Sequence, residues 1–270
     1  MNINGGQHPL HPASFPTRGK TAGLLFAGDV LYALVNLQDG PWPAVDHVLA
    51  WSADRGATWV QAGWHFPKGA GNFQPAQFLN FGRDYAGVPP ALAGFVYLIG
   101  PNQPPAGGKS CALLLARTPL AKLREPNTLE YFAGADAAGQ PHWSPRHGDA
   151  RPIFSDPQGL APGSLVYHPL LQRYLLAGFH TGPGQLGVFD APAPWGPWTT
   201  IAYENNWGGM GPAGEGLTCS FPQKWMSADG LTLGCVFSVY GDGAKLGIGA
   251  HDQFNLVMAT LILARPAKIP

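Results

Sequence analysis

Glycine and proline interrupt this chain at about one position in four. The 270 residues include 37 glycines and 28 prolines, roughly double the usual share of each. Because both residues destabilise the interior of a helix, coiled coils and long helical arrays are excluded. Disorder is not expected either, since 45% of the residues are hydrophobic and 9 are tryptophan, which provides enough apolar surface for a core. We therefore expect a globular protein of many short elements and many turns.

Charge, hydropathy and cysteine spacing narrow the function mainly by exclusion. The 16 basic and 16 acidic residues cancel, and no run of Lys or Arg occurs, so nucleic acid is not an expected partner. No apolar stretch is long enough to cross a membrane as a helix, so no membrane partner is expected. The N-terminal residues do not have the pattern of a signal peptide. Cys111, Cys219 and Cys235 are far apart and fit buried thiols better than a Cys219–Cys235 disulfide.

Short β-rich runs recur in four groups with turn residues between them. The expected strands are Ala22–Ala27, Leu31–Leu37, His47–Ser52 and Thr58–Ala62; Gln77–Phe81, Phe95–Ile99, Cys111–Arg117 and Leu129–Phe132; Ser164–Tyr167, Tyr174–Phe179, Leu186–Phe189 and Trp198–Tyr203; and Thr218–Lys224, Thr232–Tyr240 and Leu256–Leu263. Gly28-Asp29 is expected to form a hairpin turn, and Pro119–Arg124 one short helical turn. Groups of three or four strands at this spacing favour the blades of a β-propeller; a β-sandwich is the alternative.

The turn after the third expected strand has a specific sequence. Ser52-Ala53-Asp54-Arg55-Gly56-Ala57-Thr58-Trp59 resembles the Asp-box of sialidase-type propellers. Asp54 is expected to accept hydrogen bonds from N–H groups of its own turn, Gly56 to supply a positive φ, and Trp59 to pack between sheets. The resemblance implies that this turn is architectural and lies on the face opposite the ligand site, so Asp54 is not expected to be catalytic.

Longer stretches strengthen the resemblance to carbohydrate-active propellers. They are Asn72–Gln74, Phe95–Leu98, Leu115–Pro119, Leu129–Phe132, Val166–Leu176 and Ala193–Trp198. Over roughly residues 20 to 263, the chain resembles a bacterial propeller family, formerly of unknown function, whose studied members include endo-D-arabinanases acting on mycobacterial arabinan. The resemblance implies an all-β propeller related to five-bladed glycosidases, and a secreted or periplasmic location. We expect an N-terminal arm over residues 1–20 and one propeller domain over residues 21–270.

The sequence departs from that family at its start. The chain begins where the second blade of the family would begin, with Thr21–Leu24. The carboxylates proposed for catalysis in the arabinanases lie in the leading blade, so they have no counterpart here. Four blades are countable in this chain, and two interpretations stay open: the chain is a shortened version of the family, or a four-bladed ring has its own chemistry.

The propeller geometry sorts the acidic residues onto two faces. In a propeller, the blade-to-blade links and the loops between second and third strands gather on the ligand side. The acids expected there are Asp39, Asp46, Asp149, Asp156, Glu204, Glu215, Asp242 and Asp252. The acids expected in short turns on the far side are Asp29, Asp54, Asp84, Asp190 and Asp229. The acids in the turns are interpreted as turn formers.

Glycoside hydrolysis requires two carboxyl groups flanking the bond, one protonated and one ionised. Glu215 is the first candidate, because it lies among glycines immediately before an expected innermost strand. Asp156 and Asp39 are candidate partners, and each also fits a turn cap. Sugar rings stack on aromatic side chains, while amides and charged groups bind the hydroxyls. The candidate substrate-binding residues are Asn72, Gln74, Arg151, His180, Asn206, Trp207 and Tyr240.

Three functions remain open at this site. The first is hydrolysis of a polysaccharide or oligosaccharide. The second is glycan binding without catalysis, by a propeller that has lost its catalytic blade. The third is a polysaccharide lyase, in which Tyr240, His180 and Arg151 would abstract and return a proton beside a uronate. No cofactor and no metal are expected; an ion such as calcium in the channel is conceivable, but no ligand spacing supports one.

Overall fold

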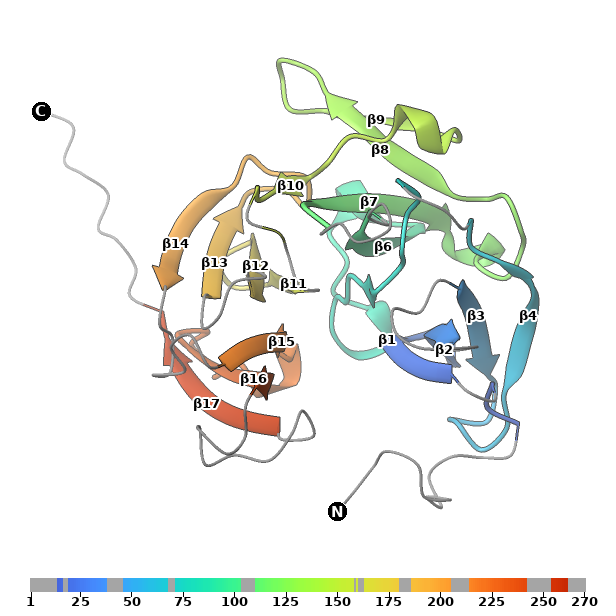
Figure 1. Cartoon of the computed structure of the whole chain (residues 1–270), viewed down its shortest axis with the longest axis horizontal. Helices are drawn as coiled ribbons and strands as arrows, with labels where there is room; N and C mark the ends of the chain where they lie inside the picture. The colour runs from blue at the N-terminus through green and yellow to red at the C-terminus, as the bar shows by residue number, and fades with distance from the viewer. Residues whose placement is uncertain are drawn as a thin grey trace, which may run out of the picture.

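The computed structural model describes residues 14–16, 19–37, 46–67, 71–102, 110–157, 159, 163–179, 186–204, 214–241 and 254–261. Their strands form four separate sheets, which Figure 1 shows as blades arranged around a common centre. The protein is therefore an all-β propeller with four blades in its described part, as the sequence predicted. We number the blades 1 to 4 in chain order.

Each blade is an antiparallel meander of consecutive strands. Blade 1 contains β1 (Gly19–Ala27), β2 (Val30–Leu37), β3 (Asp46–Ser52) and β4 (Val60–His65). Blade 2 contains β5 (Gln77–Phe78), β6 (Phe95–Pro101), β7 (Ala112–Pro119), β8 (Glu130–Ala135), β9 (Pro141–Ser144) and β10 (Phe154–Ser155). Blade 3 contains β11 (Ser164–His168), β12 (Arg173–Phe179), β13 (Leu186–Ala191) and β14 (Thr199–Glu204). Blade 4 contains β15 (Gly214–Ser220), β16 (Thr232–Gly241) and β17 (Phe254–Thr260).

Helical structure in the described residues is restricted to short 3₁₀ turns. They are η1 (Arg83–Tyr85), η2 (Pro90–Leu92), η3 (Leu120–Lys122), η4 (His147–Asp149) and η7 (Gln223–Trp225). The turn η3 confirms the short helical turn expected over Pro119–Arg124. The described part of the chain contains no helix long and apolar enough to cross a membrane.

Every expected strand is present, but blade 2 contains two strands that the sequence did not predict. β9 opens with a proline, and β10 has only two residues, so neither shows an alternating pattern. β10 pairs with the start of β7 through Phe154 and Leu113, whereas β8 pairs further along β7 through Tyr131 and Ala116. As a result, β8 and β9 form a hairpin that extends outside the ring (Figure 1).

Two predicted turns have the expected geometry. Gly28 and Asp29 both have positive φ, 56° and 60°, as a two-residue type I′ hairpin requires. In the turn after β3, the Asp54 carboxylate accepts from the Thr58 N–H at 2.8 Å and from the Thr58 hydroxyl at 2.6 Å. Gly56 has a φ of 96°, and its carbonyl accepts from the Trp59 indole N–H at 3.0 Å.

A second turn repeats this chemistry, and the sequence reasoning missed it. Ser227-Ala228-Asp229 has the same three residue types as Ser52-Ala53-Asp54. The Ser227 hydroxyl donates to Asp229 at 2.5 Å, and the Asp229 carboxylate accepts from the Leu231 N–H at 2.9 Å. The two copies are not at equivalent positions of their blades. The first joins the third strand of a blade to the fourth (β3 to β4), and the second joins the first strand to the second (β15 to β16).

Hydrogen bonds from buried and half-buried side chains join neighbouring blades to each other. Between blades 2 and 3, the Gln77 side chain forms hydrogen bonds with both backbone groups of Leu165. Between blades 3 and 4, the His168 ring lies 2.8 Å from the Gly230 carbonyl, and the Gln223 amide donates to the Tyr167 carbonyl at 2.5 Å. The main hydrophobic cluster spans blades 1 to 3, and a second cluster joins blades 3 and 4.

The cysteines are free thiols. Cys219 and Cys235 are buried, with sulfur atoms 3.4 Å apart, and Cys111 is half-buried. This arrangement agrees with the predicted thiols rather than with the alternative disulfide.

Candidate active site

The strand registers bring one set of connections to the same end of the ring. Gly19 pairs with Leu37, and Leu37 pairs with Asp46, so the start of β1 lies at the same end as the β2–β3 connection. The first strands of the blades, including β1, β11 and β15, lie nearest the centre in Figure 1. We call the end of the ring at which β1, β5, β11 and β15 begin the channel mouth.

In blade 1, a carboxylate at the channel mouth orients a histidine. Asp46 begins β3 and is buried, and its carboxylate lies 2.7 Å from Nδ1 of His65 at the end of β4. The His65 side chain is 42% exposed. A carboxylate bound to Nδ1 fixes the tautomer and leaves Nε2 to accept or donate a proton.

A second histidine, His47, follows Asp46 on β3, so its side chain lies on the opposite face of that strand from the Asp46 carboxylate. Nδ1 of His47 lies 2.7 Å from the amide oxygen of Asn36, its register partner on β2. Burial lowers the pKa of His47 to about 4, against the opposing effect of the Asp46 charge. The ring is therefore neutral at physiological pH, and its buried Nε2 has no hydrogen-bond partner among the described residues.

Asp156 is a buried acid at the channel mouth, on the link between blades 2 and 3. It follows β10 directly, and its backbone N–H donates to the Cys111 carbonyl at 2.9 Å. The Asp156 carboxylate interacts electrostatically with Tyr203 on β14, the outer strand of blade 3. Burial and this negative charge together raise the pKa of Tyr203. The turn interpretation also has support, since the Asp156 carbonyl accepts from the Gly159 N–H at 3.0 Å.

Glu215 lies within a strand, not before one. β15 begins at Gly214, so Glu215 is its second residue, and it pairs in register with Tyr240 of β16. The expectation that the strand begins at Thr218 was wrong because two glycines give Gly214–Gly216 little strand propensity. Backbone pairing with β16 overrides that preference. The register brings two of the predicted site residues, Glu215 and Tyr240, opposite each other at the channel mouth.

The remaining predicted site residues lie partly inside and partly outside the described ranges. Asn72 and Gln74 lie on the approach to β5, where the Gln74 N–H donates to the Pro101 carbonyl at 3.0 Å. Arg151 is exposed beside η4, and its backbone N–H donates to the carbonyl of Phe132 on β8 at 2.8 Å. Hydrogen bonds from Ser144 and Arg146, followed by the charges of Arg146 and Arg151, lower the pKa of Asp149. Four predicted residues, Asp39, His180, Asn206 and Trp207, lie outside the described residues.

The acids expected on the far side mostly lie in connections at the end opposite the channel mouth. Asp29 joins β1 to β2, Asp54 joins β3 to β4, and Asp229 joins β15 to β16. Asp84 lies in η1 between β5 and β6. Asp190 also lies towards that end, but it is inside β13 rather than in a turn, and it pairs with Arg173 of β12 at 2.6 Å.

Sequence reasoning missed the pairing of Asn36 with His47 and of Asp46 with His65. The sequence predicts Asp46 on the ligand side, but no sequence pattern identifies its partner. Each pair joins residues of different strands, 11 and 19 positions apart, and becomes visible only when the register is known. Within the described residues, no three His, Cys, Asp or Glu side chains are grouped as a metal site requires.

Solved structures with a similar course of the chain include three glycoside hydrolases. The Penicillium chrysogenum α-L-arabinanase complexed with arabinobiose is 12% identical, with a TM-score of 0.48 over 92% of this chain and 64% of that chain. A family 43 glycoside hydrolase from Bacillus licheniformis is 12% identical, with a TM-score of 0.48 over 89% and 56%. The Clostridium thermocellum exo-β-1,3-galactanase is 12% identical, with a TM-score of 0.39 over 92% and 59%. The chain thus spans about three fifths of the length of these proteins.

The sequence itself matches one family. No curated protein has significant sequence similarity to the chain. Residues 37–212 match the model of a family described as "Domain of unknown function (DUF4185)". This match extends from the end of β2 to beyond β14 and includes Asp46, His65 and Asp156. Since it spans more than half of the sequence, the chain belongs to the DUF4185 family.

Proposed function

We propose that this propeller is carbohydrate-active and hydrolyses a polysaccharide or oligosaccharide at the channel mouth. The observation that carries the proposal is the backbone placement of two acidic residues, on different blades, at the channel mouth. Asp156 is a buried acid at the link to blade 3, and the backbone of Glu215 begins the innermost strand of blade 4 at the same end. Two carboxyl groups on opposite sides of a cleft are what glycosidic bond cleavage requires.

In the proposed reaction the two acids have different roles. Glu215 is the general acid, which protonates the leaving glycosidic oxygen, and Asp156 or Asp39 is the ionised partner, which attacks the sugar or activates water. The carboxylate-bound imidazole of His65 lies at the same end and can hold a sugar hydroxyl or a water molecule. Asn72, Gln74, Arg151, His180, Asn206, Trp207 and Tyr240 are the proposed sugar contacts.

The sequence resemblance to a family with endo-D-arabinanases makes arabinan the first substrate to test. The full chain is incubated with arabinan, galactan, xylan and pectin, and both reducing ends and absorbance near 235 nm are followed. New reducing ends without that absorbance indicate hydrolysis. New reducing ends with it indicate a lyase, and saturable binding without either signal indicates a binding module; both results contradict the proposal.

Matched substitutions test the residue roles. Glu215→Gln and Asp156→Asn each remove one carboxyl group, and we expect activity to fall by a factor of at least about 100 for the acid. Asp84→Asn is the control, because Asp84 is exposed at the opposite end and asparagine tolerates its positive φ of 52°. Full activity of Glu215→Gln would eliminate Glu215 as the general acid.

A further inference from the structure

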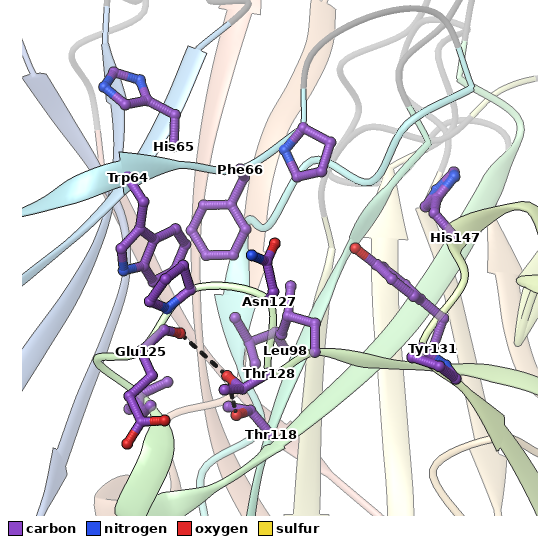
Figure 2. Close-up of a pocket in the computed structure, with 15 residues that line it drawn as sticks. Trp64, His65, Phe66, Leu98, Thr118, Glu125, Asn127, Thr128, Tyr131 and His147 are labelled. Atoms are coloured by element: carbon purple, nitrogen blue, oxygen red, sulfur yellow. Dashed lines mark hydrogen bonds between the residues drawn. The ribbon is translucent and has the colours of Figure 1, made fainter.

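One cavity among the described residues lies between blades 1 and 2. It has a volume of about 380 Å³ and is bounded by the end of β4, by residues 123–129 of the β7–β8 connection, and by Tyr131 of β8 (Figure 2). That volume is within the range of small-molecule sites. The strands β4 and β8 lie towards the outside of the ring (Figure 1), so the cavity lies away from the innermost strands, although His65, at the channel-mouth end of β4, is among its lining residues.

One wall of the cavity is aromatic and rigid. Trp64 and Phe66 contact each other edge to face, with ring centroids 5.1 Å apart. The Trp64 indole N–H donates to the Arg124 carbonyl at 3.0 Å, and the Phe66 N–H donates to the His47 carbonyl at 2.9 Å. These bonds hold both rings in place before any ligand arrives. An apolar aromatic wall of this kind packs against the C–H face of a sugar ring.

A phenol hydroxyl points into the cavity from the opposite side. Tyr131 is only 4% exposed, and its hydroxyl is directed towards the centre of the cavity in Figure 2. Its ring is held edge to face by Phe73, at 6.1 Å, and by His147, at 5.0 Å. No hydrogen bond to the hydroxyl occurs within the described part of the chain. Burial raises the pKa of Tyr131, so the phenol stays protonated and can donate as well as accept.

The side-chain amide of Asn127 also lines the cavity. Asn127 has a positive φ of 61°, and its amide lies towards Phe66 in Figure 2. The turn that carries it is fixed by Thr128, whose hydroxyl accepts from Thr118 at 2.8 Å and lies 3.2 Å from the Glu125 carbonyl. Among the described residues the Asn127 amide has no hydrogen-bond partner. An amide and a phenol with free hydrogen-bonding capacity on a rigid frame suit a ligand rich in hydroxyl groups.

The charges around the cavity favour an uncharged ligand. No lysine or arginine side chain is among its described lining residues, and the Arg124 guanidinium instead lies over the rings of Tyr32 and Trp51. The Glu125 carboxylate points away from the cavity in Figure 2. An anionic sugar would therefore meet no compensating cation apart from the histidines.

We propose that this cavity is a second carbohydrate site, which binds one or two neutral sugar residues. The sugar ring lies against Trp64 and Phe66, and its hydroxyls bond to Tyr131 and Asn127. The site does not depend on hydrolysis at the channel mouth. It would hold a chain of sugars on the outside of the propeller while another part of the same polymer reaches the centre.

The test measures binding of the full chain to an array of neutral oligosaccharides, followed by titration of the best probe and of trigalacturonate. Tyr131→Phe removes only the hydroxyl, and Asn127→Gly removes the amide but keeps the positive φ. Each is expected to weaken binding about 2- to 10-fold. Tyr167→Phe and Gln172→Gly are the matched controls, the latter because Gln172 also has a positive φ, 52°. As a direct readout, the tryptophan emission change on binding should be reduced in Trp64→Phe.

The outcomes separate this site from the channel mouth. Binding that weakens in Tyr131→Phe and Asn127→Gly, but is unchanged in Glu215→Gln, supports the cavity site even if no hydrolysis is found. Absence of saturable binding to the array overturns it, as does tighter binding of trigalacturonate. Binding that is lost in Glu215→Gln and unaffected by both cavity variants also overturns it, while leaving the proposed function intact.

Discussion

The side-chain amide of Gln77 forms two hydrogen bonds with the backbone of Leu165, its nitrogen donating to the carbonyl at 2.8 Å and its oxygen accepting from the N–H at 3.1 Å. Gln77 begins the innermost strand of blade 2, and Leu165 lies in the innermost strand of blade 3. One side chain thus replaces the strand partner that Leu165 lacks towards the centre of the ring. A contact of this kind fixes the angle between two blades.

Replacement of Gln77 by leucine should therefore destabilise the protein. Leucine leaves the N–H and C=O of Leu165 unpaired, and Leu165 is 1% exposed. We expect the free energy of unfolding to fall by about 2–4 kcal/mol. Urea denaturation measures it, with Gln61→Leu as the control because Gln61 is exposed on β4. Equal stability of the two variants would show that the Gln77 bonds contribute little.

Two glycine substitutions separate backbone strain from steric conflict. Gly94 and Gly230 both have positive φ, 84° and 71°. A Cβ at Gly94 meets no atom within 4 Å, whereas a Cβ at Gly230 comes 2.6 Å from Cε1 of the buried His168. Gly94→Ala should cost about 1 kcal/mol. Gly230→Ala should cost about 3 kcal/mol or more, because it also displaces the hydrogen bond between His168 and Gly230.

Thermal and urea denaturation of both alanine variants measure this difference. The additional variant His168→Ala removes the ring that the new Cβ would strike. In its background, Gly230→Ala should cost about as much as Gly94→Ala, because the remaining close atom, Cδ1 of Leu170 at 3.0 Å, is the end of an exposed, flexible side chain. A large cost that persists without the ring would place the conflict elsewhere.

Burial of His47 should make stability depend on pH. Burial lowers the pKa of His47 to about 4 in the folded state, against about 6.5 in an unfolded chain. Between these values the unfolded state binds the extra proton, so stability falls as the pH decreases from about 6.5 towards 4. For a group that is not fully buried, we expect a loss on the order of 2–3 kcal/mol.

The variant His47→Asn isolates this contribution, because asparagine keeps an N–H to donate to Asn36 but does not titrate. Its stability should decline less than that of the wild type between pH 6.5 and 4.5. His142→Asn, at an exposed position of β9, is the control and should retain the wild-type pH dependence. Parallel curves for the wild type and His47→Asn would contradict a neutral, buried His47.

The electrostatic contact between Asp156 and Tyr203 can be measured directly. Burial and the Asp156 charge raise the pKa of Tyr203, so Asp156→Asn should shift that pKa down, towards the ordinary value of about 10. Titration of ¹³C-labelled tyrosine by NMR follows the change, with Tyr203→Phe to assign the signal. Asp84→Asn should leave it unmoved. An unchanged Tyr203 would mean that the carboxylate is not held beside the outer strand of blade 3.

The sequence determined the architecture because local rules govern most of it. Gly28-Asp29 specifies its hairpin through the two positive φ values that these residue types tolerate. Asp54 specifies its turn through hydrogen bonds that reach only four residues. Alternating apolar runs between such turns predict every strand of the four blades except β9 and β10 of blade 2. The strand that began earlier than expected, β15, contains glycines whose weak preference is overridden by pairing with β16.

Only the tertiary structure decided which side chains meet. The pairs Asn36–His47 and Asp46–His65 depend on strand register, and the register follows from packing of whole blades rather than from neighbouring residues. The cavity that places Trp64 opposite Tyr131 arises because β8 pairs only with the second half of β7 and the β7–β8 connection lies against the end of β4. Turn chemistry and alternation act over a few positions and were readable from the sequence alone. A cavity lined by Trp64 and Tyr131, which are 67 positions apart (131 − 64), requires the assembled ring.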